Sequence, residues 1–130
     1  MDAATRNLVR QRAGNRCEYC GRRQEESPLA TLHVEHILPR KHGGSDDPEN
    51  LALACPNCNA FKGANVAGYD RQTGHLTELF HPRRHVWPEH FEWRGVLIIG
   101  KTAIGRTTVD VLELNAPQRV KVRIASRDQA

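Results

Sequence analysis

Four cysteines in two closely spaced pairs constrain the fold of this chain more than any other feature of its sequence. Two residues separate Cys17 from Cys20, two separate Cys55 from Cys58, and 34 residues lie between the pairs. This spacing lets both thiolates of a pair reach one ion, and four sulfur ligands suit tetrahedral zinc with no open coordination position. Disulfides or a thioredoxin-type redox motif are the alternative, but two matched pairs in a short chain favour metal. We therefore predict one structural zinc site that closes the segment between the pairs.

Length and hydropathy predict a small domain without a membrane segment. The chain has 130 residues, which suggests one domain over 1–130 with a modest core. Its longest apolar run, residues 96–99, is far short of the roughly 20 residues of a spanning helix, and no apolar signal core follows Met1. We therefore expect a cytoplasmic protein with no membrane contact, in a reducing environment where cysteines hold metal rather than form disulfides.

The distribution of charge suggests an anionic partner. The net charge is +4; residues 1–32 carry six basic and four acidic side chains, residues 33–70 three and five, and residues 71–130 ten and six. Basic flanks around an acidic centre suit a polyanion that is held at its phosphates while the central carboxylates hold a cation. The alternative is the ordinary basic surface of a soluble protein.

Periodicity, caps and turn residues predict a mixed α+β fold. The expected elements of the first half are a helix over 2–14, strands over 31–37 and 51–54 joined by a glycine-rich loop, and a helix from Pro56 to about 68. Those of the second half are strands over 76–80, 91–94 and 96–99 and helices over 102–113 and 117–127. A strand interpretation stays open near the C-terminus, because Val109, Val111, Val120, Val122 and Ile124 alternate along the chain.

The central segment resembles a known family in an ordered series of motifs. These are Glu35-His36-Ile37, Gly43-Gly44, Asn50-Leu51, Cys55-Pro56-Asn57-Cys58-Asn59 and Lys62-Gly63. Together they are similar to HNH endonucleases of the zinc-ribbon type. The resemblance implies a ββα-metal (His-Me finger) nuclease centre, with its core at about 16–63, an N-terminal helix and a C-terminal extension over 64–130. The extension is less specifically similar to the tails of small bacterial members.

The resemblance also implies roles for individual residues. His36 matches the general base that takes a proton from the attacking water, and Asn50 matches the asparagine that braces the loop carrying the base. Glu35 and Asn59 match the protein ligands of a catalytic Mg²⁺ or Mn²⁺, although aspartate is more usual than glutamate at the first position. The chemistry suits these residue types, because histidine titrates near neutral pH and oxygen ligands suit hard cations.

Several further residues are candidates for contact with nucleic acid. They are His33, which could instead be a third ligand of the cation, and His42, Lys62, Arg83 and Arg84. An aromatic strip that includes Trp87 and Trp93 could stack bases, but we expect Trp93 to cover the small core of the extension.

The sequence therefore predicts a hydrolase, a divalent-metal-dependent HNH endonuclease that acts on DNA with little sequence specificity. Two alternatives stay open. The same centre could cleave RNA, as a toxin does, or the chain could be a non-catalytic zinc module that binds nucleic acid or a protein partner. The preferred metal and the oligomeric state are not predicted.

Overall fold

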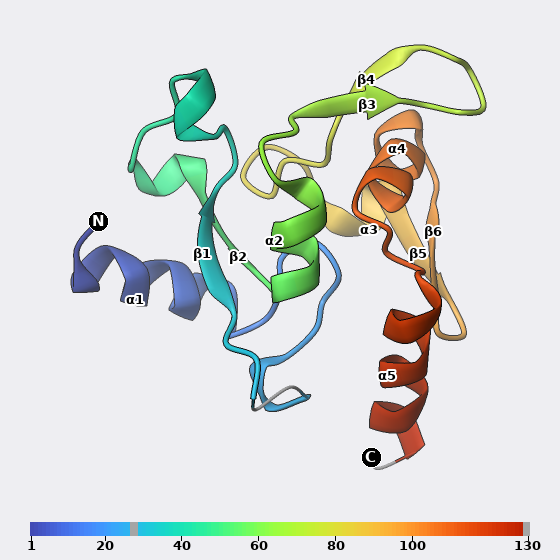
Figure 1. The fold of residues 1–130 in the computed structure, drawn as a ribbon, viewed down its shortest axis with the longest axis horizontal. Coiled ribbons are helices and arrows are strands. Elements are labelled where there is room, and N and C mark those ends of the chain that lie inside the picture. The colour runs from blue at the N-terminus through green and yellow to red at the C-terminus, as the bar shows by residue number, and fades with distance from the viewer. Residues whose placement is uncertain (27–28, 129–130) are drawn as a thin grey trace.

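The computed structural model describes residues 1–26 and 29–128, and it shows a mixed α+β fold (Figure 1). The α-helices are α1 (Ala3–Arg12), α2 (Pro56–Lys62), α3 (Trp87–His90), α4 (Ala103–Val111) and α5 (Pro117–Asp128). The strands are β1 (His33–His36), β2 (Leu51–Ala54), β3 (Ala67–Tyr69), β4 (Leu76–Glu78), β5 (Phe91–Arg94) and β6 (Leu97–Gly100). They pair in order as three antiparallel hairpins. Among the helices of the described residues, none is long and apolar enough to cross a membrane.

A ββα unit forms the half of the fold that holds the predicted nuclease centre. In register, β1 runs antiparallel to β2 from the His33–Ala54 pair to the His36–Leu51 pair, and α2 follows β2 directly. All four residues of β2 are buried, because α1 and α2 both contact this strand. The expected order of strand, loop, strand and helix is therefore confirmed.

The N-terminal helix is fastened to this unit by its own arginines. Asp2 caps α1 by accepting a hydrogen bond from the Thr5 amide at 2.8 Å. Near the other end, Arg10 donates to the Leu32 carbonyl at 3.0 Å and Arg12 donates to the Leu51 carbonyl at 2.6 Å. These bonds join α1 to the chain that enters β1 and β2, so the helix supports the strands that carry the site.

The second half packs its hairpins against two helices. Thr102 caps α4 through the Gly105 amide at 3.0 Å, and α5 begins at Pro117, so both predicted helices are confirmed and the strand alternative is wrong. The close approach of α4 to the end of α3 requires glycine, because a Cβ on Gly105 would lie 2.0 Å from the His90 carbonyl oxygen. One core cluster extends from Val9 to Leu114 and includes residues of both halves.

Several expected boundaries differ from those of the structure. The helix expected to reach about residue 68 ends at Lys62, because Gly63 has a positive φ of 50° that turns the chain out of the helix. Residues 67–69 then form the strand β3, which was not expected, and they pair with β4, which is shorter than the expected strand over 76–80. The short helix α3 was not predicted.

Candidate metal site and active-site pocket

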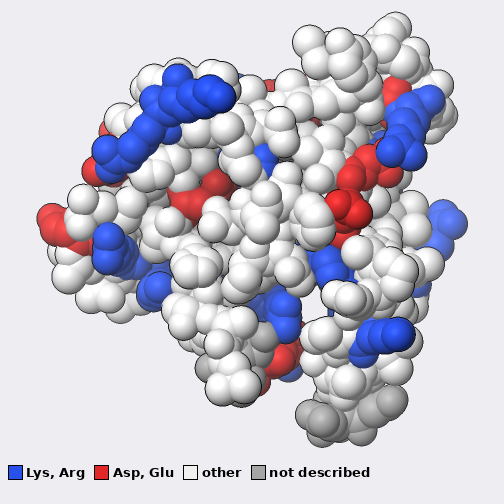
Figure 2. All heavy atoms as spheres, viewed as in Figure 1, with Lys and Arg blue, Asp and Glu red and all other residues white. Residues whose placement is uncertain are grey.

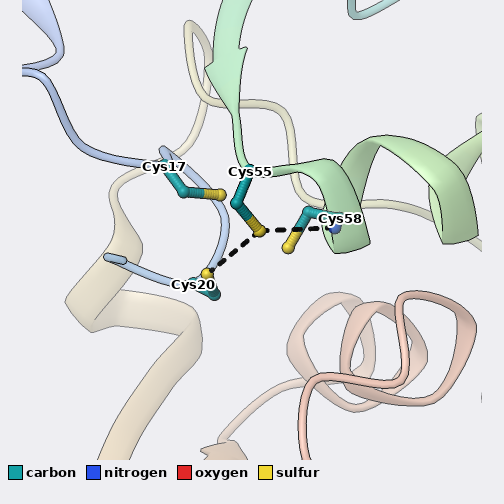
Figure 3. A group of neighbouring side chains, drawn as sticks. All are labelled: Cys17, Cys20, Cys55 and Cys58. Carbon is teal, nitrogen blue, oxygen red and sulfur yellow. Dashed lines mark hydrogen bonds between the residues drawn. The ribbon is translucent and has the colours of Figure 1, made fainter. Parts of the chain in front are cut away.

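The four cysteine side chains converge on one point (Figure 3). Their sulfur atoms all lie within 4.8 Å of one another, and Cys20 Sγ lies 3.7 Å from Cys55 Sγ. The first pair sits in a tight turn that Gly21 completes at a φ of 80°. The second pair opens α2, where Cys55 Sγ accepts a hydrogen bond from the Cys58 amide at 3.4 Å. This arrangement is consistent with the predicted zinc knuckle.

The electrostatics of the cluster fit a bound cation. All four thiols are buried, and burial raises the pKa of both Cys17 and Cys58. A hydrogen bond from Cys17 lowers the pKa of Cys55, because a neighbouring thiol stabilises its thiolate. Four buried thiolates are stable together only with a compensating positive charge. The donor set is therefore suited to Zn²⁺ held by four sulfurs.

Arg119 is a contact of this cluster that sequence reasoning missed. Its guanidinium donates to Cys58 Sγ at 3.0 Å and to the Leu112 carbonyl at 2.8 Å, and the residue is 7% exposed. A buried cation beside the sulfurs offsets part of the negative charge of a four-thiolate centre. Because Arg119 lies in α5, it also ties the C-terminal helix to the metal site.

A separate pocket brings together three of the predicted catalytic residues. Glu35 and His36 of β1 and Asn59 of α2 all line a cavity of about 310 Å³, together with Val34, Pro39, Arg40 and Gly63. Among the described residues, no hydrogen bond to the Asn59 side chain is found, so its amide oxygen is available to a ligand. Antiparallel pairing of β1 with β2 and the turn into α2 place these residues together across 24 positions of sequence.

Glu35 is buried and already has two partners. The residue is 7% exposed; the Tyr19 hydroxyl donates to its Oε1, and Lys62 Nζ lies 3.3 Å from its Oε2. Burial raises the pKa of Glu35, and the positive charge of Lys62 opposes this rise. Lys62 is thus the buried positive charge that compensates the carboxylate of Glu35.

His36 pairs with an acidic residue that the sequence analysis did not select. Its Nε2 lies 2.7 Å from Asp46 Oδ1, and Arg40 Nη2 donates to the same oxygen at 2.8 Å. The hydrogen bond from His36 lowers the pKa of Asp46, so this carboxylate is ionised and accepts. The imidazole therefore carries its proton on Nε2, which leaves Nδ1 as the nitrogen that can accept one.

The loop between β1 and β2 is held by Asn50. Its side chain accepts from the Leu38 amide at 2.8 Å and donates to the carbonyls of Leu38 at 3.0 Å and Ser45 at 2.9 Å. The loop closes so tightly that a Cβ on Gly44 would lie 1.6 Å from the Leu38 carbonyl oxygen. Asn50 and Gly44 together keep Asp46 close to His36.

The residues expected to contact nucleic acid have different environments. His33, His42 and Arg84 are exposed, and Arg84 pairs with Glu78 at 2.9 Å. Lys62 is instead 2% exposed. Its ammonium group donates to the Ile37 carbonyl at 2.9 Å and lies beside the buried carboxylate of Glu35, whose charge it neutralises. Arg83 is largely buried in an ion pair with Glu18, and burial lowers its pKa to about 10. We therefore leave Lys62 and Arg83 out of the nucleic-acid surface.

Surface charge is mixed rather than collected in one patch. Figure 2 shows basic side chains at several places around the face that it draws, with acidic side chains among them in separate groups. On this face, the basic flanks of the sequence therefore do not form one continuous positive surface around the acidic central segment.

Comparisons with known proteins agree with the geometry of the first half. Residues 17–65 match the family model described as HNH endonuclease. Over 110 residues the chain is 29% identical to a protein named Septu protein PtuB from Bacillus thuringiensis, an alignment that covers 83% of this chain and 40% of that protein. The chain thus spans less than half the length of this curated relative. No solved structure matches the chain.

Proposed function

We propose that the chain, whose residues 17–65 match the HNH endonuclease family model, hydrolyses phosphodiester bonds in DNA with the help of a divalent cation. The observation that carries this proposal is the pocket that unites Glu35, His36 and Asn59. A base, a carboxylate and an amide oxygen within one open cavity are the minimum set for metal-assisted hydrolysis of a phosphodiester. The whole chain is proposed to be one cytoplasmic domain, with its nuclease core at about 16–63.

The cation would be held by Glu35 and Asn59. Carboxylate and amide oxygens suit Mg²⁺ or Mn²⁺, which keep several water ligands and need few protein groups. When bound, such an ion neutralises the charge that builds up on the phosphate and on the leaving oxygen. Lys62 stabilises the ionised form of Glu35, which is the form that a cation requires. Zinc in the four-cysteine cluster is proposed to have a structural role only.

His36 would act as the general base through Nδ1. Its hydrogen bond to Asp46 fixes the tautomer and the orientation of the ring, and Asn50 fixes the loop that carries Asp46. An ionised carboxylate on one imidazole nitrogen makes the other nitrogen a better proton acceptor. Asp46 is therefore a positioning residue for the base.

Replacing Asp46 with alanine is expected to lower kcat by roughly 10- to 100-fold with little change in KM, an effect of the size known for the carboxylate partners of metal-bound histidines. Asp46→Glu should recover part of the loss, since its carboxylate can still accept from Nε2. Nicking kinetics measure the effect, and Glu49→Ala, which removes an exposed carboxylate from the same loop, is the matched control. Equal rates for the two alanine variants would exclude Asp46 from the reaction.

Whether the protein cleaves DNA or RNA is tested with DNA and RNA substrates that have the same nucleotide sequence. Purified protein is incubated with the DNA duplex, each DNA strand and the matching RNA, in Mg²⁺, Mn²⁺ or EDTA. We expect metal-dependent cleavage of DNA. Cleavage of RNA alone would replace DNA as the substrate, and binding of either polymer without cleavage would favour a non-catalytic module.

A further inference from the structure

Helix α5 carries three arginines that form a row along one of its faces. Arg119, Arg123 and Arg127 are spaced four residues apart, so each lies about one turn beyond the previous one. Like charges at this spacing destabilise a helix unless other groups compensate them. The partners of each arginine therefore show which of the three positive charges is not compensated by a negative group of the protein.

The compensation decreases from the start of the helix to its end. Arg119 contacts the thiols of the cysteine cluster. Arg123 donates to neutral oxygens only, including the Val96 carbonyl at 3.1 Å and Asn115 Oδ1 at 3.1 Å, and burial lowers its pKa. Arg127 is exposed, and within the described part of the chain it has no hydrogen bond or ion pair. Two positive charges at this end of the row thus lack a carboxylate partner among the described residues.

These two arginines border a cavity with an aromatic wall. The cavity has a volume of about 160 Å³ and lies between α5, Trp93 of β5 and the turn that follows Cys20. The guanidinium carbons of Arg123 and Arg127 lie 5.5 Å and 5.8 Å from the centre of the Trp93 ring, which is within the range of a cation–π contact. Trp93 is 43% exposed, so it does not cover the core as we had expected from the sequence.

Among the described residues that line this cavity, the acidic one is already neutralised. Glu26 lines the cavity, but Arg23 Nε lies 2.9 Å from its Oε1. The cavity therefore offers positive charge and an aromatic surface. It has no lining residue in common with the pocket of Glu35, His36 and Asn59.

We infer that the cavity between α5 and Trp93 binds a backbone phosphate of the nucleic acid, as a second contact outside the active-site pocket. The inference rests on the proposed function, because that function supplies a phosphate at every nucleotide of the substrate. Trp93 holds the guanidinium planes in place, and their N–H groups bind phosphate oxygens as charge-assisted donors. Contact at two separate places would retain the substrate at the pocket while one bond is cut.

The test measures binding of a fluorescent DNA duplex by His36→Ala protein, so that cleavage plays no part. Adding Arg127→Gln should weaken binding by roughly 3- to 10-fold at low salt and reduce the slope of log affinity against log salt by about 1, because one phosphate contact is lost. Arg71→Gln, added to the same background, is the matched control. It removes the same charge from an arginine that is 85% exposed on the turn between β3 and β4 and is not part of the cavity.

Tryptophan fluorescence gives a second readout that locates the contact. The chain has two tryptophans, so DNA should change an emission signal that disappears in Trp93→Phe while Trp87 remains. Equal affinity and salt slope for the Arg127 and Arg71 variants, or a fluorescence response unaffected by Trp93→Phe, would overturn the inference. If the His36→Ala parent binds no DNA at all, the proposed substrate is wrong as well, which separates the two failures.

Discussion

Replacing His36 with alanine is expected to lower the rate of plasmid nicking by roughly 100- to 10,000-fold, the usual contribution of a general base. The fold should survive, because the side chain is only partly buried and its recorded partner is Asp46 in the loop. Raising the Mn²⁺ concentration should recover almost none of the loss, since more metal supplies no positioned proton acceptor.

Glu35→Gln is the comparison that separates base from ligand. Glutamine keeps an oxygen for Tyr19 and Lys62, whereas alanine would leave the Lys62 ammonium buried without its carboxylate. Loss of the negative charge weakens binding of the catalytic cation, so a high Mn²⁺ concentration should recover part of the activity. Nicking rates of both variants across a metal titration, with circular dichroism as the folding control, make the comparison. Recovery of His36→Ala to near the parent rate would show that another group is the base, with His33 the next candidate.

Cys58→Ser is expected to abolish both zinc binding and cooperative unfolding. A structural zinc site contributes on the order of 10 kcal/mol, comparable to the whole stability of a small domain. The loss should spread to α5, because Arg119 donates to the Cys58 sulfur. Activity should also fall, since Asn59 directly follows this ligand in α2.

Zinc content from mass spectrometry and thermal unfolding followed by circular dichroism measure this effect. As a control, the parent protein is stripped of metal with a chelator and given zinc again, which should restore the unfolding transition. The same addition should not rescue Cys58→Ser. A serine variant that unfolds cooperatively without zinc would show that the cluster is not needed for folding.

Local sequence signals predicted the parts of the molecule that depend on local physics. The spacing within Cys17–Cys20 and Cys55–Cys58 predicted the cluster, because each pair forms a single turn. Thr102 and Pro117 predicted where α4 and α5 begin, since caps and helix-starting prolines act within a few residues. The ordered motifs around His36 predicted the ββα unit.

Partners far apart in the chain were not predictable in this way. Nothing local distinguishes Asp46 from Asp47, yet only Asp46 reaches the His36 ring across the closed loop. Arg119 and Cys58 meet only after both halves have folded, so no spacing rule connects them. Lys62 and Arg83 look like ordinary surface cations in the sequence, and their burial becomes visible only when Glu35 and Glu18 are placed beside them.

The most direct test asks whether the pocket of Glu35, His36 and Asn59 is the active site of a metal-dependent DNA nuclease. It measures the conversion of supercoiled plasmid to nicked circles by the zinc-loaded protein. The reaction is run in Mg²⁺, in Mn²⁺ and in EDTA, with His36→Ala protein purified in parallel. We predict nicking by the parent protein only where a divalent cation is present, and almost none by the variant. Plasmid that stays supercoiled in both metals, or nicking that persists in EDTA or at the same rate in His36→Ala, would contradict the assignment.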